Sequence, residues 1–97
     1  MKQFNPPHPG TFILETYMKP FELSCRFLSD KLDVAPSTLN RILQGKSGIS
    51  AEMALRLSKA LGRSPESWLS MQQNWDLWQA QKKVKLTGVK KVRLDVA

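Results

Sequence analysis

Polar side chains able to form hydrogen bonds with DNA bases are concentrated between Pro36 and Ser47. Arginine can donate two parallel hydrogen bonds to guanine, and asparagine or glutamine can pair in a similar way with adenine. Such groups fall on one side of a predicted helix, whose exposed residues are Pro36, Ser37, Thr38, Asn40, Arg41 and Gln44. The loop that follows is expected to place Lys46 and Ser47 near the phosphate backbone.

Catalytic and metal chemistry have little support in the sequence. The chain contains one histidine, His8, and one cysteine, Cys25, so it lacks the ligands of a His/Cys zinc site. His8 has no candidate nucleophile, and we interpret Cys25 as a plain buried or half-buried thiol. We therefore expect no enzymatic activity, no metal and no cofactor.

The length and the charge of the chain indicate one small basic domain with a separate tail. The chain has 97 residues, with 15 Lys and Arg against 8 Asp and Glu, which gives a net charge of +7. Residues 1–81 hold nine basic and seven acidic residues, whereas residues 82–97 hold six basic residues and one acidic residue. Cationic surfaces attract nucleic acid, but most of this excess lies outside the predicted domain. We divide the chain into a domain of residues 1–81 and a basic tail of residues 82–97.

The location of the protein follows from what the sequence lacks. It contains no run of about 18 apolar residues, and its start has neither the apolar stretch nor the cleavage site of a signal peptide. A single cysteine cannot form an internal disulfide. We expect a cytoplasmic protein that does not contact a membrane.

Prolines, glycines and serines divide the predicted domain into five helices of an all-α bundle. We expect a loop through Gly10, then a first helix over about residues 11–18 that ends before Pro20. Serine N-caps, N-terminal prolines and glycine C-caps delimit the rest. The predicted ranges are 25–32, 36–44, 50–61 and 65 to about 82.

The second and third predicted helices, about residues 25–44, have the apolar spacing of a helix-turn-helix. Two short crossing helices need a small residue at the crossing, here Ser29, and an apolar residue in the turn, here Val34. The flanking apolar positions are Leu28, Leu32, Leu39 and Ile42. A polar helix face can also be merely solvated, but the number of positions that agree favours DNA binding.

The last predicted helix and the tail suggest an interface. Trp68 is expected in the core. For Trp78, near the helix end, a position at an interface or on a partly exposed surface is nearly as compatible with the sequence as a position in the core. The alternation in Val84-Lys85-Leu86 and in residues 92–96 favours a strand or hairpin, which is marginal in isolation. The tail therefore either pairs with another chain or stays disordered, and Trp78, Val84 and Leu86 are the candidate interface residues.

The stretch from Phe27 to Lys46 resembles the lambda-repressor-like (XRE) helix-turn-helix domain. His8-Pro9-Gly10 and the segments 49–54 and 64–72 are similar to the HigA (VapI) branch of that family, so the resemblance covers about residues 8–81. It implies a homodimeric antitoxin that binds a palindromic operator in its own promoter. It also implies a partner toxin of the HigB type, an mRNA endonuclease.

The resemblance also implies roles for individual residues. Ser37, Thr38, Asn40 and Arg41 would face the bases, and Lys46 and Ser47 the DNA backbone. Three positions depart from the family pattern: Asp33 replaces a common glycine, Ala35 a capping serine or threonine, and Cys25 a phosphate-binding glutamine. Asp33 brings negative charge near the DNA, and Ala35 lacks a capping bond, so both bear on operator affinity.

Two other functions stay open on the sequence alone. The protein could be a stand-alone transcriptional repressor without a toxin, which the absence of a neighbouring toxin gene would favour. It could also be a protein-interaction module that has lost DNA binding, and Asp33 and Ala35 are the features that keep this alternative open.

Overall fold

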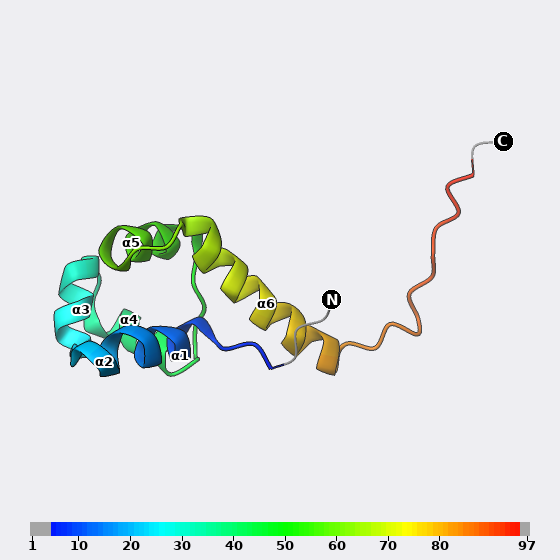
Figure 1. Cartoon of the computed structure of the whole chain (residues 1–97). Helices are drawn as coiled ribbons and strands as arrows, with labels where there is room; N and C mark the ends of the chain where they lie inside the picture. The colour runs from blue at the N-terminus through cyan, green and yellow to red at the C-terminus, as the bar shows by residue number, and fades with distance from the viewer. Residues whose placement is uncertain (1–4, 96–97) are drawn as a thin grey trace.

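The computed structural model describes residues 5–95 and places five helical rods in a small bundle, followed by an extended tail (Figure 1). Its dimensions are 60 × 25 × 24 Å, and the long axis reflects the tail and the last helix. The predicted all-α fold is confirmed, and no strand occurs among the described residues. None of the helices within residues 5–95 has both the length and the apolar character needed to cross a bilayer.

The first rod is one continuous helix made of three parts. These are α1 (Pro9–Ile13), a π-helical segment (Leu14–Met18) and α2 (Lys19–Phe21). The predicted limits were wrong at both ends, because the helix begins at Pro9 and continues past Pro20. Residues 1–4 of the expected opening loop lie outside the described residues.

The π-helical segment explains why Pro20 does not end this rod. The Lys19 N–H donates to the Leu14 carbonyl, five residues back, so the helix widens just before the proline. Pro20, which has no N–H to donate, follows this widened turn directly as the second residue of α2. The rod ends at Glu22, which adopts a left-handed conformation with φ of 53°.

Three of the remaining helices begin where the sequence predicted, and the helix predicted from Ser50 begins one residue later, at Ala51, because Ser50 is its N-cap. The remaining helices are α3 (Cys25–Leu32), α4 (Pro36–Leu43), α5 (Ala51–Leu61) and α6 (Pro65–Lys83). Three serine hydroxyls cap helix starts by accepting backbone N–H groups at 3.0 to 3.1 Å, and these are Ser24, Ser50 and Ser64. Helix α4 has no such bond because Ala35 occupies its N-cap, and Pro36 fills its first position.

The core lies between these helices, and Trp68 on α6 is its largest side chain. Its ring is fully buried and packs edge-on against Phe12, with centroids 5.8 Å apart. The indole N–H donates to the Gly62 carbonyl at 2.9 Å, so burial leaves no polar group unpaired. Other fully buried apolar side chains come from α1, α3, α4 and α5 and include Ile13, Leu28, Leu39 and Leu57.

The tail differs from the expected strand or hairpin. Residues 84–95 form no strand, and one turn, in which the Val89 N–H donates to the Leu86 carbonyl at 2.9 Å, interrupts an extended path. Strand hydrogen bonds need a second strand, and a single chain offers none here. Val84 and Leu86 are 56% and 65% exposed. Val96 of the predicted pattern lies outside the described residues.

Candidate nucleic-acid interface

Helix α4 separates an apolar face from a polar face. Leu39 and Ile42 are buried, at 0% and 2% exposed, and hold the helix on the bundle. The polar residues predicted to read bases are mostly on the opposite, exposed side: Pro36, Ser37, Asn40, Arg41 and Gln44 are exposed, and Thr38 is half-buried. The only charge on this helix is Arg41, so hydrogen-bonding groups rather than net charge distinguish the surface.

The turn between α3 and α4 is built around Asp33. Asp33 adopts a left-handed conformation with φ of 58°. The Val34 N–H donates to the Ser29 carbonyl at 3.0 Å, and the Asp33 N–H to the Asp30 carbonyl at 3.1 Å. This pair of bonds is a Schellman motif, which ends α3 and sets the direction of α4.

Arg56 on α5 holds the same turn from outside. One terminal nitrogen of its guanidinium donates to the carbonyls of Leu32 and Asp33, at 2.9 and 3.0 Å. The other donates to Glu52 at 2.8 Å, which fixes the side chain along α5. Arg56 was not among the predicted site residues, although the i, i+4 spacing of Glu52 and Arg56 indicates the ion pair. The contact with the turn has no local signal, because 23 residues separate Arg56 from Asp33.

Cys25 also links the two helices. Its thiol donates to the carbonyl of Pro36 at 3.6 Å, so the start of α3 lies beside the start of α4. The thiol is half-buried, which confirms the plain structural interpretation. The position that in the family commonly carries a phosphate-binding glutamine therefore has a contact within the protein here.

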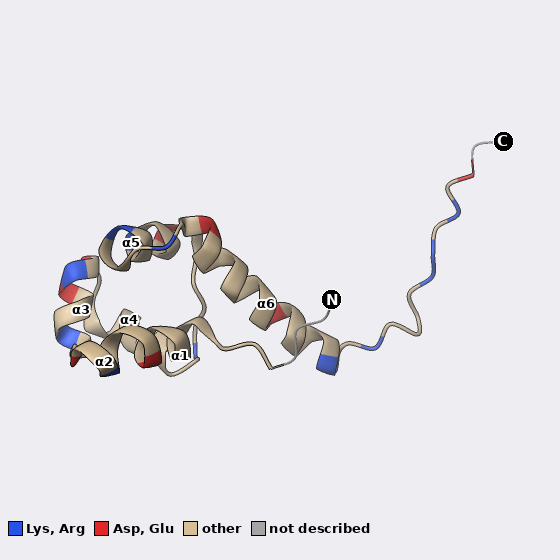
Figure 2. Ribbon diagram, viewed as in Figure 1, with Lys and Arg blue, Asp and Glu red and all other residues tan. Residues whose placement is uncertain are grey.

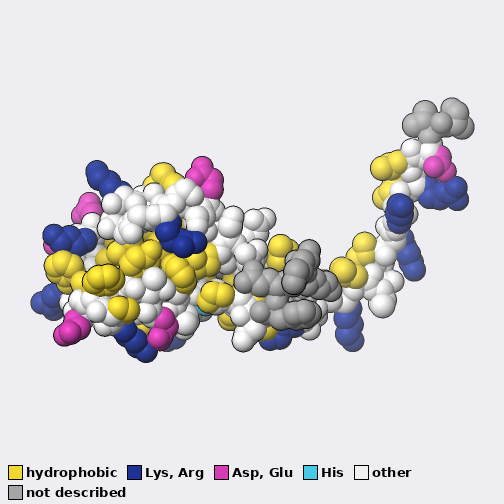
Figure 3. Space-filling model, in the orientation of Figure 1, with side chains coloured by type: hydrophobic (Ala, Val, Ile, Leu, Met, Phe, Trp, Pro, Cys, Tyr) yellow, Lys and Arg dark blue, Asp and Glu magenta, His cyan; other side chains and the backbone are white. Residues whose placement is uncertain are grey.

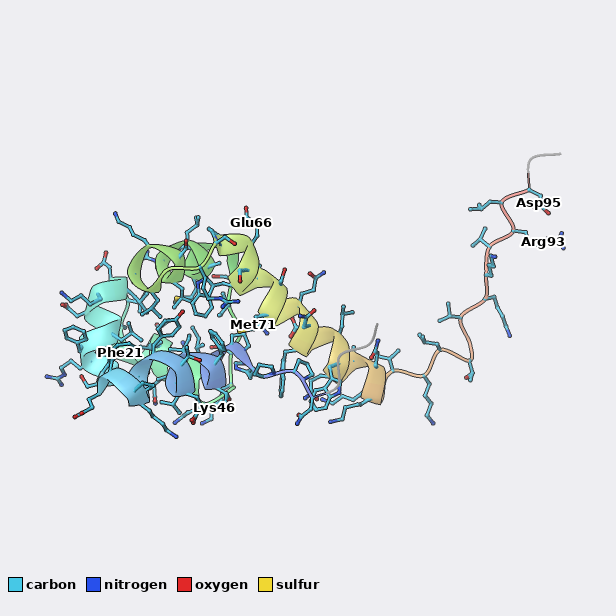
Figure 4. The ribbon with its side chains drawn as sticks, in the orientation of Figure 1. Phe21, Lys46, Glu66, Met71, Arg93 and Asp95 are labelled. Carbon is cyan, nitrogen blue, oxygen red and sulfur yellow. The ribbon has the colours of Figure 1, made fainter. Side chains whose placement is uncertain are left out.

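A second Schellman motif closes α4 and presents Lys46. Gly45 has φ of 76°, and the Lys46 N–H donates to the Arg41 carbonyl at 2.9 Å. Lys46 is exposed and Ser47 is half-buried. Figure 4 shows Lys46 at the lower edge of the bundle, beyond the ribbon of the first rod. The loop is then fixed to α6, because the Ile49 N–H donates to Gln72 at 2.8 Å.

Helix α4 packs on α1 with almost no space between the two backbones. A Cβ atom placed on Gly10 would lie 1.9 Å from the carbonyl oxygen of Ile42 and 2.9 Å from the Cα of Leu43. Only glycine permits so short an approach. Helix α1 therefore supports α4 directly from behind its polar face.

His8 fixes the start of α1 and was not predicted to do so. Its Nδ1 accepts the Gly10 N–H at 2.9 Å, and its ring packs edge-on against Trp75 with centroids 5.3 Å apart. Burial lowers the pKa of His8 below its ordinary value, and the negative charge of Asp76 offsets part of this effect. The neutral ring that burial favours is the form that can accept the bond.

Comparison with known proteins establishes the family. The helix-turn-helix family HTH_3 matches residues 14–68, which include α3, α4 and α5. The chain belongs to the HTH_3 helix-turn-helix family. The uncharacterized HTH-type transcriptional regulator YddM of Escherichia coli strain K12 is 37% identical over 92 residues, which cover 95% of this chain and 97% of YddM.

Solved structures of helix-turn-helix antitoxins resemble the whole chain. Antitoxin GraA matches with a TM-score of 0.86 at 37% identity and covers 95% of this chain and 99% of its own. A structure of antitoxin GraA in complex with its operator gives a TM-score of 0.82 and covers 100% of this chain and 98% of its own. The HigA antitoxin of Pseudomonas aeruginosa, solved with the higBA promoter, matches with a TM-score of 0.72 at 27% identity. The match covers 86% of this chain and 99% of the HigA chain. The resemblance to the HigA branch is confirmed.

The structure of this helix-turn-helix chain brings most predicted site residues together. The residues of α4 and the exposed Lys46 lie on one continuous segment, and Ser47 follows half-buried. Trp78, Val84 and Leu86 lie at the far end of α6 and in the tail, away from α4 (Figure 1). Figure 2 shows the same separation in the charges, because Lys and Arg recur along the tail. The chain thus carries a polar surface, formed by the exposed residues of α4 with Lys46 and called the DNA-type surface below, and a separate tail that is both basic and apolar.

Proposed function

We propose that this helix-turn-helix protein is a DNA-binding antitoxin that represses its own operon. The observation that carries the proposal is the exposed polar face of α4, which the Asp33 turn and Arg56 hold in a fixed direction. The same fold, over the full length of this chain, occurs in antitoxin GraA in complex with its operator. That match supports both parts of the role.

The proposed DNA contact is insertion of α4 into the major groove. Ser37, Thr38, Asn40 and Arg41 would meet base edges, with Pro36 and Gln44 at the two ends of the same surface. Lys46 and Ser47, in the loop after α4, would contact phosphates and fix the register. The N-terminal ends of α3 and α4, which lie side by side, would face the phosphate backbone of one DNA strand.

A palindromic operator requires two copies of α4, so we propose a homodimer. The half-sites would then lie about 34 Å apart, one turn of B-DNA, or a multiple of that spacing. The proposed interface contains Trp78, Val84 and Leu86, and the exposed apolar tail supports it. Leu77, Ala80, Gln81, Val84 and Leu86 line an open groove of about 420 Å³ that a tail strand from a second copy could fill.

The proposed toxin partner is a HigB-like mRNA endonuclease encoded beside this gene, in the cytoplasm. The antitoxin would neutralise the toxin by binding it and would perform no catalysis itself. Co-purification of the tagged protein with the product of the neighbouring gene tests this part. A toxic neighbour that co-purifies and is neutralised supports the antitoxin role. If the protein binds its operator but no product of a neighbouring gene, it is a stand-alone repressor, in keeping with the description of its relative YddM as an HTH-type transcriptional regulator.

Substitution of Arg41 tests the DNA surface. Arg41→Ala is expected to weaken binding to the upstream region of its own gene by about 1–3 kcal/mol, which is roughly 5- to 150-fold, because a forked base contact is lost. Lys46→Ala should instead weaken binding to specific and random duplexes alike. It should also reduce the slope of the logarithm of the binding constant against the logarithm of the salt concentration by about 1. Gel-shift titrations over a range of salt concentrations measure both effects.

Lys59→Ala is the matched control, since it removes one exposed positive charge from α5 rather than from α4 or its loop. It should leave the preference for the operator unchanged. If Arg41→Ala keeps full operator affinity, α4 does not read bases through this residue. If the unmodified protein binds no duplex specifically, the alternative of an interaction module that has lost DNA binding is the correct one.

A further inference from the structure

A groove between α3 and α5 exposes apolar side chains that the proposed DNA surface does not use. Its free volume is about 750 Å³, within the range of sites that bind other molecules. Phe27 and Leu55 are 48% and 61% exposed. The larger apolar residues along the groove are Leu23, Phe27, Leu28, Leu32, Leu55 and Leu61. Figure 3 shows apolar side chains gathered on the body of the molecule, with basic and acidic side chains at its edge.

The rim of the groove is mostly positive. Lys31, Arg56 and Lys59 line it together with one acidic residue, Asp33. Arg56 is already paired with Glu52, whereas Lys31 and Lys59 form no ion pair among the described residues. The ammonium of Lys31 lies 5.3 Å from the centre of the Phe27 ring, at the border between the apolar floor and the rim. An occupant with negative charge beside apolar side chains would complement both parts.

Charge argues against two other occupants. The tail of this chain or of a second copy carries Lys85, Lys90, Lys91 and Arg93 and would be repelled by the rim. A nucleic-acid backbone would place phosphates over an apolar floor, where their charge loses hydration. In addition, no residue of α4 lines the groove, so it is separate from the surface proposed to bind DNA.

We propose that the groove between α3 and α5 binds an amphipathic, acidic helix of a partner protein. Helix-in-groove recognition places leucine-type anchors at i, i+3, i+4 and i+7 into an apolar channel between two helices. Acidic residues beside those anchors would face Lys31 and Lys59. Because α4 does not line the groove, the partner binds whether or not α4 is on DNA, and the proposal does not depend on operator binding.

A synthetic peptide of about 18 residues, above the length at which isolated helices are marginal in water, tests the site on the full chain. It carries leucines at the anchor spacing and glutamates between them, and its twin carries lysines in place of the glutamates. Fluorescence anisotropy and amide chemical shifts follow each titration. We expect the glutamate peptide to saturate below about 1 mM, with shifts at α3 and α5, and the lysine peptide to bind at least about tenfold more weakly.

Two substitutions at exposed positions locate the site without disturbing the core. Lys59→Glu and Leu55→Ser should each weaken binding of the glutamate peptide by about tenfold. Lys90→Glu in the tail is the control, because it changes the net charge by the same amount as Lys59→Glu, and it should have little effect on binding. Circular dichroism checks that each variant is folded. If Leu55→Ser does not fold, Lys59→Glu alone is enough to locate the site.

Several outcomes would overturn the proposal. They are absence of saturation, equal binding of the lysine peptide, shifts confined to the tail, or loss of binding in Lys90→Glu but not in Lys59→Glu. Concentration-dependent shifts at α3 and α5 in a chain shortened to end at Lys83, accompanied by a doubling of its mass, would show that a second copy occupies the groove instead.

Discussion

At the scale of single residues, His8 matters through its acceptor nitrogen and not through acid–base catalysis. Its Nδ1 accepts the Gly10 N–H, and its ring is only 7% exposed beneath Trp75. A proton on Nδ1 would remove the acceptor and place a charge in a desolvated position. The same contact therefore makes the start of α1 sensitive to pH.

The expected consequence is a loss of stability in mildly acidic solution. The pKa of His8 is lowered in the folded protein, whereas the unfolded chain keeps a value near 6.5. Between these two values the unfolded state binds more protons, so the contribution of the neutral ring is complete above about pH 6.5 and is lost as the pH falls toward the lowered value. Urea unfolding at pH values from about 7.5 to 5 measures it.

His8→Asn supplies the control, because asparagine is a good N-cap but does not titrate. This variant should lose the part of the pH dependence between about pH 6.5 and 5, where carboxylates contribute little. His8→Ala should lose about 1 kcal/mol of unfolding free energy at pH 7.5, where the wild-type cap is intact. An unchanged pH profile in His8→Asn would show that His8 does not titrate on unfolding.

Residue types decided how much of the site was predictable. The exposed polar side of α4 and the missing cap at Ala35 followed from local sequence, because each depends on neighbours a few positions away. His8 and Arg56 did not follow. Histidine is not among the preferred N-cap residues, and the carbonyls that Arg56 reaches lie on a different helix.

At the scale of helices, the contact between α1 and α4 is the most restrictive packing in the fold. Atoms of the α4 backbone occupy the space beside Gly10, and backbone cannot move aside as a flexible side chain can. By contrast, a Cβ on Gly48 would meet only the end of the Gln72 side chain. The position of the DNA-type surface is thus set by a single glycine on another helix.

Gly10→Ala is expected to destabilise the protein by about 2 kcal/mol or more. Alanine favours a helix over glycine by up to about 1 kcal/mol, but the steric overlap with Ile42 exceeds that gain. Thermal and urea unfolding measure the loss. Gly88→Ala serves as the control, since nothing lies within 4 Å of its Cβ position, and should change stability by less than about 0.5 kcal/mol. A Gly10→Ala variant as stable as wild type would mean that α1 and α4 separate at little cost.

Helix limits were predictable wherever a cap encodes them. Ser24, Ser50 and Ser64 begin helices, and Gly45 and Gly62 end them with positive φ, as predicted. The first rod was misjudged because a proline usually ends a helix, and the wider turn that accommodates Pro20 depends on hydrogen bonds five residues apart. No side-chain pattern marks that change.

At the scale of the whole molecule, the chain consists of a nearly neutral bundle and a strongly basic tail. The bundle carries the DNA-type surface on hydrogen-bonding side chains, and the tail carries most of the net charge. The tail's apolar residues are also exposed: Val89, Val92 and Leu94 are 68%, 68% and 81% exposed. A monomer gives these residues nothing to pack against, in keeping with the proposed dimer.

A chain that ends at Lys83 is expected to keep the bundle and lose the dimer. Its helical content should equal that of the full chain, because residues 84–95 form no strand or helix. Light scattering coupled to size-exclusion chromatography should give the mass of a dimer for the full chain and of a monomer for the shortened one. The double variant Val84→Ser, Leu86→Ser, which retains length and charge, should also be monomeric. Equal masses for the full and shortened chains would exclude the tail from the interface.

The π-helical segment Leu14–Met18 has a consequence for comparing relatives of different length. A π turn accommodates one residue more than the corresponding α-helical turn. A relative that lacks one residue between Ile13 and Lys19 can therefore form an ordinary α-helix there and still present the residues on both sides to the same neighbours. Alignments of this family should place a single-residue gap within this segment, and a one-residue deletion there should be tolerated better than one inside α4.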